Sequence, residues 1–245
     1  MKTLIVIPSR MASSRFPNKP MATINGKPMI QRVWEKAIES NVGEVIVACC
    51  DEEVSSCIDS LGGKAIMTDP DLPTGTDRIF QAIKNKEDIT QFDSIINLQG
   101  DLPIINPEDI SKVNIPLSQG FDIGTLVTDL KENQVNDINI TKAEVNWIKK
   151  NLIGQALNFS RTNKNKDIDY YHHVGIYSFR YEILKRFVSI SPTNNEINLK
   201  LEQLRALDSK ITIGVNYVND VPISVDTKED LIKIEKILKV RNDKN

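Results

Sequence analysis

The strongest constraint on the fold is an alternation of short apolar runs and amphipathic helical patterns over the first half of the chain. Each apolar run is too short for a buried helix and is rich in β-branched residues, which is typical of strands buried in a parallel sheet. A helical pattern follows each run. In chain order the segments are TLIVI, 29–40, EVIVACC, 51–61, KAIM, 76–85, SIINL and 107–118. The alternation predicts an α/β fold with a mostly parallel central sheet and helices on both faces.

The pattern changes at about residues 121–181, where strand-like runs are separated by polar turns. We therefore expect a β-rich insertion within a single domain that spans residues 1–245. Helical periodicity then returns. The later segments are the helical YEILKRFV and LKLEQLRAL, the strand-like ITIGVNYV and VPISV, and a last helix at about 228–240.

Composition limits the classes of partner. The chain of 245 residues carries a formal net charge of -2, so no overall basic field favours nucleic acid. No apolar run reaches membrane-spanning length, and we expect no membrane association. The three cysteines, Cys49, Cys50 and Cys57, fit neither a disulfide framework nor a zinc-ligand spacing. We therefore expect a reduced, cytoplasmic protein.

A cationic loop follows the first predicted strand. The segment IPSRMASSRFPNKPM contains Arg10, Arg15 and Lys19, and no acid precedes Glu35. Ligands of α/β sheets bind beyond the carboxyl ends of the strands, where this loop lies. The glycine patterns of P-loops and of dinucleotide-binding turns are absent. The loop could surround a polyphosphate or be an ordinary solvated basic loop, and the residues alone leave both interpretations open.

Two carboxylates follow later apolar runs. Asp101 comes directly after SIINLQG, and Asp226 comes directly after VPISV. Mg²⁺ prefers one or two carboxylates together with phosphate oxygens, so the pair could hold this ion, but either residue could instead build a turn or cap a helix. The spacing of Thr227 and Asp230 predicts a capping box that leaves Asp226 free at a strand end, unless Asp226 is itself the cap. Two carboxylates and a cationic loop suit phosphoryl or nucleotidyl transfer.

Several of these segments resemble one enzyme family. The similar motifs, in family order, are IPSRMASSRFPNKPM, INGKPMI, TGTDRI, NLQGDLP, NFSR, HHVGIYSF, LEQLRAL and VPISVDTKEDL. They resemble the 3-deoxy-manno-octulosonate cytidylyltransferases (CMP-KDO synthetases), which are nucleotidyltransferases with a GT-A-like fold. The resemblance implies that CTP and KDO, an eight-carbon 2-keto sugar acid, react with Mg²⁺ to give CMP-KDO and pyrophosphate for lipopolysaccharide biosynthesis. It also suggests a homodimer, with the β-rich insertion serving both dimerisation and sugar binding.

The resemblance also assigns roles by motif. The catalytic residues are Lys19, Asp101 and Asp226, with Asp101 and Asp226 as the magnesium ligands. The nucleotide-binding residues are Arg10, Ser14, Arg15, Lys19, Gly75, Arg78 and Gln99. The sugar-binding residues are Arg161, His173, Tyr177, Glu202 and Gln203. Gly75 and Arg78 could instead simply open a helix capped by Thr76. Adjacent strand residues face opposite sides, so His172 and His173 cannot both line one pocket, and the family pattern favours His173.

Three positions depart from the family pattern, and two other functions are open. Leu102, Asn158 and His172 stand where many members have Glu, Tyr and Arg, so a modified keto acid such as 8-amino-KDO is an alternative substrate. Asp69 and Asp71 in TDPDLP could form the Asp-x-Asp metal motif of a glycosyltransferase, although Asp residues beside Pro often build turns. The chain could also be a nucleotide-binding module without turnover.

Overall fold

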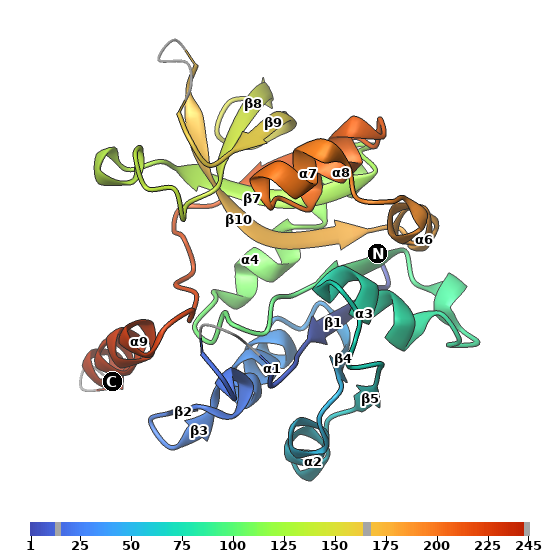
Figure 1. The fold of residues 1–245 in the computed structure, drawn as a ribbon, viewed down its shortest axis with the longest axis vertical. Helices are drawn as coiled ribbons and strands as arrows, with labels where there is room; N and C mark the ends of the chain where they lie inside the picture. Colours follow the sequence, from blue (N-terminus) through green and yellow to red (C-terminus); the bar gives the residue numbers. More distant parts are fainter. Residues whose placement is uncertain (13–15, 164–167, 243–245) are drawn as a thin grey trace. The chain divides into compact units, whose positions relative to one another are not determined.

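The computed structural model describes residues 1–12, 16–163 and 168–242 (Figure 1). The chain forms two compact units. Unit 1 consists of Met1–Phe92, Asn97–Ile110 and Pro222–Asn245, and unit 2 consists of Asp93–Ile96 and Ser111–Val221. The insertion predicted at about 121–181 lies inside unit 2, which also contains the segments on either side of it.

Unit 1 is built on a parallel sheet. Its strands run in the order β5-β4-β1, and both pairings are parallel. The strands are β1 (Thr3–Pro8), β4 (Gly43–Cys49) and β5 (Ala65–Met67), and the helices packed against them are α1 (Met29–Glu39), α2 (Glu52–Ser60) and α3 (Gly75–Ile83). Residues 4–7 of β1 are completely buried, as expected for a central strand covered on both faces.

The remaining elements of unit 1 are short, apart from the last helix. They are the 3-10 helices η1 (Lys19–Met21) and η2 (Ile89–Gln91), the short strands β2 (Thr23–Ile24) and β3 (Lys27–Pro28), and α9 (Lys228–Asn242). An apolar cluster attaches α9 to this region. Val225 and Ile234 pack there with Phe16, Ile24 and Met29. Burial of these side chains fixes the segment before α9 beside η1.

Unit 2 is β-rich. Its strands are β6 (Ser94–Asn97, whose last residue belongs to unit 1), β7 (Ile123–Asp129), β8 (Lys142–Lys149), β9 (Ile153–Ser160), β10 (Tyr170–Phe179) and β11 (Ile213–Tyr217). They run in the order β6-β10-β7-β11-β9-β8, and β10 also pairs with β8. The helices are α5 (Ile115–Ser118), η3 (Glu132–Gln134), α6 (Tyr181–Ser189), α7 (Asn194–Leu199) and α8 (Gln203–Asp208). In sequence, α4 (Pro107–Lys112) crosses from unit 1 into unit 2.

The α/β fold class is confirmed, but two predicted helices are each divided. The pattern at 107–118 forms α4 and α5, because Pro116 lies in the first turn of α5 and a proline there starts a helix more readily than it continues one. LKLEQLRAL is also not one helix. Lys200 adopts the left-handed conformation (φ 53°), which ends α7 before α8 begins.

The strand expected at VPISV does not form. Residues 221–225 carry no strand assignment in the structure, because Pro222 has no N–H to donate to a ladder. Near its end, the Val225 N–H donates to the Asp101 carbonyl oxygen (3.0 Å). Within the described parts of the chain, no helix combines the length and apolarity needed to cross a membrane.

Candidate active site

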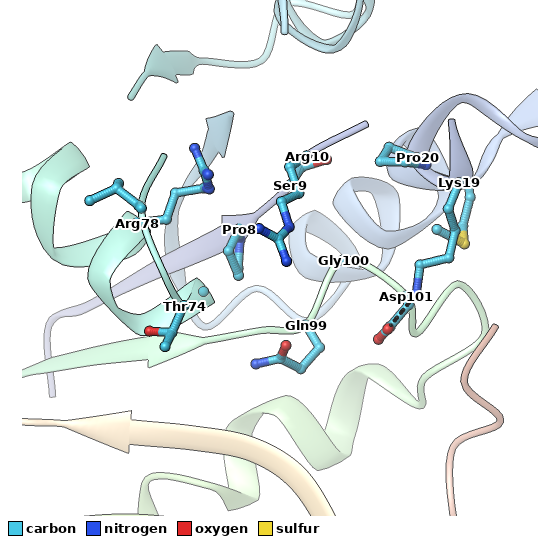
Figure 2. Close-up of a pocket in the computed structure, with 13 residues that line it drawn as sticks. Pro8, Ser9, Arg10, Lys19, Pro20, Thr74, Arg78, Gln99, Gly100 and Asp101 are labelled. Carbon is cyan, nitrogen blue, oxygen red and sulfur yellow. Dashed lines mark hydrogen bonds and ion pairs between the residues drawn. The ribbon is translucent and has the colours of Figure 1, made fainter. Parts of the chain in front are cut away.

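A polar cleft of about 320 Å³ lies beyond the carboxyl end of β1 in unit 1. Figure 2 shows its lining side chains, which come from the segments after β1 and β6 and from η1 and α3. Six predicted residues line it: Arg10, Lys19, Gly75, Arg78, Gln99 and Asp101. Ser14 and Arg15 lie outside the described residues. The predicted gathering of these segments at one strand end is therefore confirmed.

Close backbone packing around Pro8 shapes the cleft. The Leu98 N–H donates to the Val6 carbonyl oxygen (3.1 Å), which attaches the segment after β6 to β1. A Cβ on Gly100 would lie 2.8 Å from the Pro8 carbonyl oxygen, and one on Gly75 would lie 3.3 Å from Pro8 Cγ. Glycine thus allows both neighbouring segments to approach the end of β1 closely.

The two predicted carboxylates converge on the Lys19 ammonium. Lys19 Nζ lies 2.8 Å from Asp101 Oδ2, a contact drawn in Figure 2, and 3.6 Å from Asp226 Oδ1. It also donates to the Val225 carbonyl oxygen at 2.8 Å. The side chains of Asp101 and Asp226 are 28% and 35% exposed, so ligands can reach both. Sequence reasoning identified all three charged groups but missed the Val225 carbonyl, because backbone oxygens carry no sequence signal.

The capping box predicted before the last helix is present and directs Asp226. The Asp230 N–H donates to Thr227 Oγ1 (3.3 Å), and the Thr227 N–H donates to Asp230 Oδ2 (3.0 Å). The Asp226 N–H donates to the same carboxylate oxygen (3.1 Å). Asp230 therefore closes a reciprocal cap with Thr227 at the start of α9, and Asp226, directly before this cap, has Oδ1 3.6 Å from Lys19 Nζ.

Arg78 has a role in the protein framework as well as a place in the cleft lining. Its side chain is buried, and Nη1 donates to Thr68 Oγ1 (2.5 Å) and to the Asp69 carbonyl oxygen (3.1 Å). These bonds hold the turn after β5 against α3. The cap of α3 is Thr74, which accepts from the Asp77 N–H (3.1 Å), so the expectation that Thr76 caps this helix is wrong.

Asp69 and Asp71 form an exposed turn. The Asp71 N–H donates to Asp69 Oδ1 (2.9 Å), which is an Asx turn. The Asp69 N–H in turn donates to Gln81 Oε1 (2.6 Å). This geometry favours the turn interpretation of TDPDLP over the metal motif of a glycosyltransferase.

Two of the predicted sugar-binding residues, His173 and Tyr177, lie on β10 in unit 2. His173 is buried, its Nε2 lies 3.0 Å from Thr125 Oγ1, and its ring centroid lies 5.5 Å from that of Tyr177. Burial, followed by the neighbouring His172, lowers the pKa of His173 to about 3. Burial, followed by the charge of Glu202, raises the pKa of Tyr177 above its ordinary value. At neutral pH both rings are uncharged hydrogen-bonding groups.

His172 has different surroundings from His173, as the strand alternation predicts. It is half-buried and its Nδ1 lies 3.3 Å from Gln134 Oε1. Burial and then the Lys142 ammonium lower its pKa to about 4. The family's arginine at this position is therefore replaced by a side chain that is neutral near pH 7.

Arg161 lies at the end of β9, and its guanidinium donates to backbone carbonyl oxygens of unit 2. The acceptors are Leu199 (3.2 Å), Ile138 (3.2 Å), Asn139 (3.3 Å) and Lys200 (3.4 Å). It thereby attaches β9 to the loop before β8 and to the turn that leads into Glu202 and Gln203. These donors bind the protein itself, which sequence reasoning did not anticipate.

The buried histidine makes stability depend on pH. In the unfolded chain His173 titrates near pH 6.5, whereas in the folded chain it stays neutral until about pH 3. Below pH 6.5 only the unfolded state gains this proton, so stability falls by about 1.4 kcal/mol per pH unit. Between pH 7 and pH 5 we expect the free energy of unfolding of His173→Gln, measured with urea, to fall by about 2 kcal/mol less than that of the wild type. Equal falls would contradict a neutral, buried His173.

An α/β unit in which two carboxylates converge on one lysine, beside a cleft lined by further cations, has the site of a nucleotidyltransferase. Comparisons with known proteins agree with this class. A family model described as cytidylyltransferase matches residues 4–213. This chain belongs to the cytidylyltransferase family.

Individual relatives are similar over nearly their whole length. The 3-deoxy-manno-octulosonate cytidylyltransferases of Paramagnetospirillum magneticum and Rhodospirillum centenum are 42% and 41% identical to this chain. These matches cover 96% and 97% of this chain and 97% and 94% of the relatives. A solved structure of CMP:2-keto-3-deoxy-manno-octonic acid synthetase complexed with CTP is 34% identical to this chain, with a TM-score of 0.88. The match covers 98% of this chain and 100% of the chain in that structure.

Proposed function

We propose that this protein transfers CMP from CTP to KDO, releasing pyrophosphate, in the cytoplasmic stage of lipopolysaccharide biosynthesis. The observation that carries the proposal is the convergence of Asp101 and Asp226 on Lys19, which lines the cleft of unit 1 together with Asp101. The names of the similar proteins, at 34–42% identity over nearly the whole chain, support the particular substrates.

The cleft suits a triphosphate. Arg10 lines it with an exposed guanidinium, which can offer a planar pair of donors to phosphate oxygens, and Lys19 can supply a compact charge. Ser9 also lines the cleft, and its Oγ is buried with no hydrogen-bond partner among the residues that the structure describes. A buried hydroxyl of this kind is expected to bind a ligand or water.

We propose Asp101 and Asp226 as the ligands of Mg²⁺. Both carboxylates already lie within 3.6 Å of one cationic atom, Lys19 Nζ, and the Val225 carbonyl oxygen lies at the same point. Oxygen donors around a single position are the ligand set that Mg²⁺ prefers, with phosphate oxygens and water completing it. The described residues contain no cluster of three or more His, Cys, Asp or Glu side chains that could hold a metal. When bound, Mg²⁺ neutralises charge on the triphosphate.

The reaction is an in-line displacement at phosphorus. The anomeric hydroxyl oxygen of the sugar acid attacks the α-phosphorus, its proton is lost, and the bond to the oxygen bridging the β-phosphate breaks. Lys19 and Arg10 stabilise charge on the departing pyrophosphate. In unit 2 we propose Arg161 as the partner of the sugar carboxylate, with neutral His173 and Tyr177 as hydrogen-bonding groups.

A homodimer is also proposed, through unit 2. Ile148, Leu152 and Leu157, on or beside β8 and β9, are exposed to 68%, 43% and 49%. Exposed apolar side chains grouped on neighbouring strands are typical of an interface. The mass in solution, read by sedimentation, tests this part of the proposal.

The function is tested by measuring pyrophosphate release with each of the four nucleoside triphosphates against KDO, 8-amino-KDO and other keto sugar acids. We expect release with CTP and KDO to exceed that with any other pair. Preferred release with 8-amino-KDO would move the substrate to a modified acid. Nucleotide binding without release from any pair would contradict the enzymatic proposal and favour a binding module.

A further inference from the structure

Lys142, a completely buried lysine of β8, lies at the junction of three strands in unit 2. Its backbone pairs with Ser160 at the end of β9 and with His172 on β10. Each partner is directly followed in sequence by a proposed sugar-binding residue, Arg161 or His173. Lys142 is therefore paired with residues directly beside both the charged and the neutral group proposed to bind the sugar acid.

The Lys142 ammonium binds backbone oxygens. Nζ donates to the carbonyl oxygens of Asp137, Ile140 (3.1 Å) and Arg161 (2.9 Å). Burial lowers the pKa of the Lys142 ammonium; the charge of Asp137 offsets only part of this effect, and the nearby Arg161 guanidinium adds to it. Three carbonyl acceptors around one buried ammonium hold the backbone at fixed positions, because each oxygen would lose its donor if it moved.

Arg161 also binds the loop before β8, residues 137–140, whose carbonyl oxygens accept from Lys142. The Arg161 guanidinium donates to the carbonyl oxygens of Ile138 (3.2 Å) and Asn139 (3.3 Å), between the two loop residues bound by Lys142. Lys142 thus fixes the main chain of Arg161 directly. It also fixes the loop whose carbonyls orient the Arg161 side chain.

His173 is connected to the same junction. Its N–H donates to the carbonyl oxygen of Thr141, the residue before Lys142, at 2.9 Å. Arg161 in turn reaches the Leu199 carbonyl (3.2 Å), just before the turn that leads into Glu202. A shift at Lys142 would therefore displace several of the groups proposed to bind the sugar.

We propose that Lys142 is a positioning residue for the sugar acid, acting through Arg161 and His173 without touching the substrate. The inference rests on the proposed function, because it assigns the sugar carboxylate to Arg161. A buried positive charge in the same unit also favours an anionic ligand, since charges interact more strongly away from water.

The test is Lys142→Met, with Lys149→Met as the matched control, because Lys149 lies on the same strand but is exposed. We expect Lys142→Met to raise the KM for KDO about tenfold or more, while the KM for CTP and kcat change less than about threefold. Lys149→Met should leave all three constants near the wild type. Lys142→Arg, which keeps the charge and its donors, should recover part of the loss.

Coupling to Arg161 separates positioning from a general loss of structure. In the Arg161→Ala background, Lys142→Met should add less than about threefold to the KM for KDO, because the group that it positions is already absent.

An unchanged KM for KDO in Lys142→Met, equal rises for KDO and CTP, or full additivity with Arg161→Ala would overturn the inference. If Lys142→Met does not fold, Lys142→Gln carries the test, and a wild-type KM for KDO in an intact Lys142→Gln would overturn the inference. Failure of the wild type to release pyrophosphate from CTP and KDO would instead overturn the proposed function.

Discussion

Replacing Asp101 with asparagine is expected to lower kcat by about 10²-fold or more, because the change removes a metal ligand and its charge while keeping its shape. Asp101 Oδ2 lies 2.8 Å from Lys19 Nζ and is open to the cleft. The loss should persist at saturating CTP, KDO and Mg²⁺, and steady-state pyrophosphate release measures it. Near-wild-type turnover at saturating Mg²⁺ would reject the proposed role of Asp101.

Asp71→Asn is the matched control for this experiment. Asp71 belongs to the exposed Asx turn after β5, so the same chemical change there should leave kcat within about twofold of the wild type. The pair of variants also separates two functions. A large loss in Asp71→Asn with little loss in Asp101→Asn would favour the glycosyltransferase interpretation, in which Asp69 and Asp71 hold the metal.

The sequence predicted the framework of unit 1 because its signals are local and periodic. The runs at β1, β4 and β5 are buried strands, and the parallel sheet brings their carboxyl ends to one edge. This geometry is why Arg10 and Asp101 could be placed together from sequence. The capping box of Thr227 and Asp230 likewise depends only on spacing along a helix, so its prediction was confirmed.

The remaining features depend on tertiary contacts that no spacing reveals. Lys200 ends α7 in a left-handed conformation, although lysine carries no turn signal. Arg161 donates to the carbonyl oxygen of Leu199, which is far away in sequence. Arg78 donates to the carbonyl oxygen of Asp69, in the turn before its own helix. The VPISV segment has β-branched residues but forms no strand, because Pro222 has no N–H for a ladder, and the Val225 N–H bonds the Asp101 carbonyl oxygen in the segment after β6.

Lys19→Met is expected to lower kcat by about 10²-fold, through loss of charge stabilisation on the pyrophosphate, and at the same time to strengthen Mg²⁺ binding without nucleotide. In the structure Lys19 Nζ lies between the two proposed ligands, at 2.8 Å from Asp101 and 3.6 Å from Asp226. Two unit charges about 4 Å apart near a protein surface interact by roughly 4 kcal/mol before solvent screening. An ion that enters this position must displace the ammonium.

This competition between the ion and the ammonium can be measured by calorimetric titration. The wild type and Lys19→Met are each titrated with Mn²⁺ or Mg²⁺ in the absence of nucleotide. We expect the variant to bind the ion at least about fivefold more tightly, a modest part of the unscreened interaction because both carboxylates are partly exposed. Lys27→Met is the control, since Lys27 pairs with Glu35 and does not line the cleft. If Lys19→Met loses turnover but binds the ion no more tightly than Lys27→Met, the lysine and the metal do not share one position. The ammonium would then act on the phosphates alone, and Asp101 and Asp226 would need no exchange of partner when the triphosphate arrives.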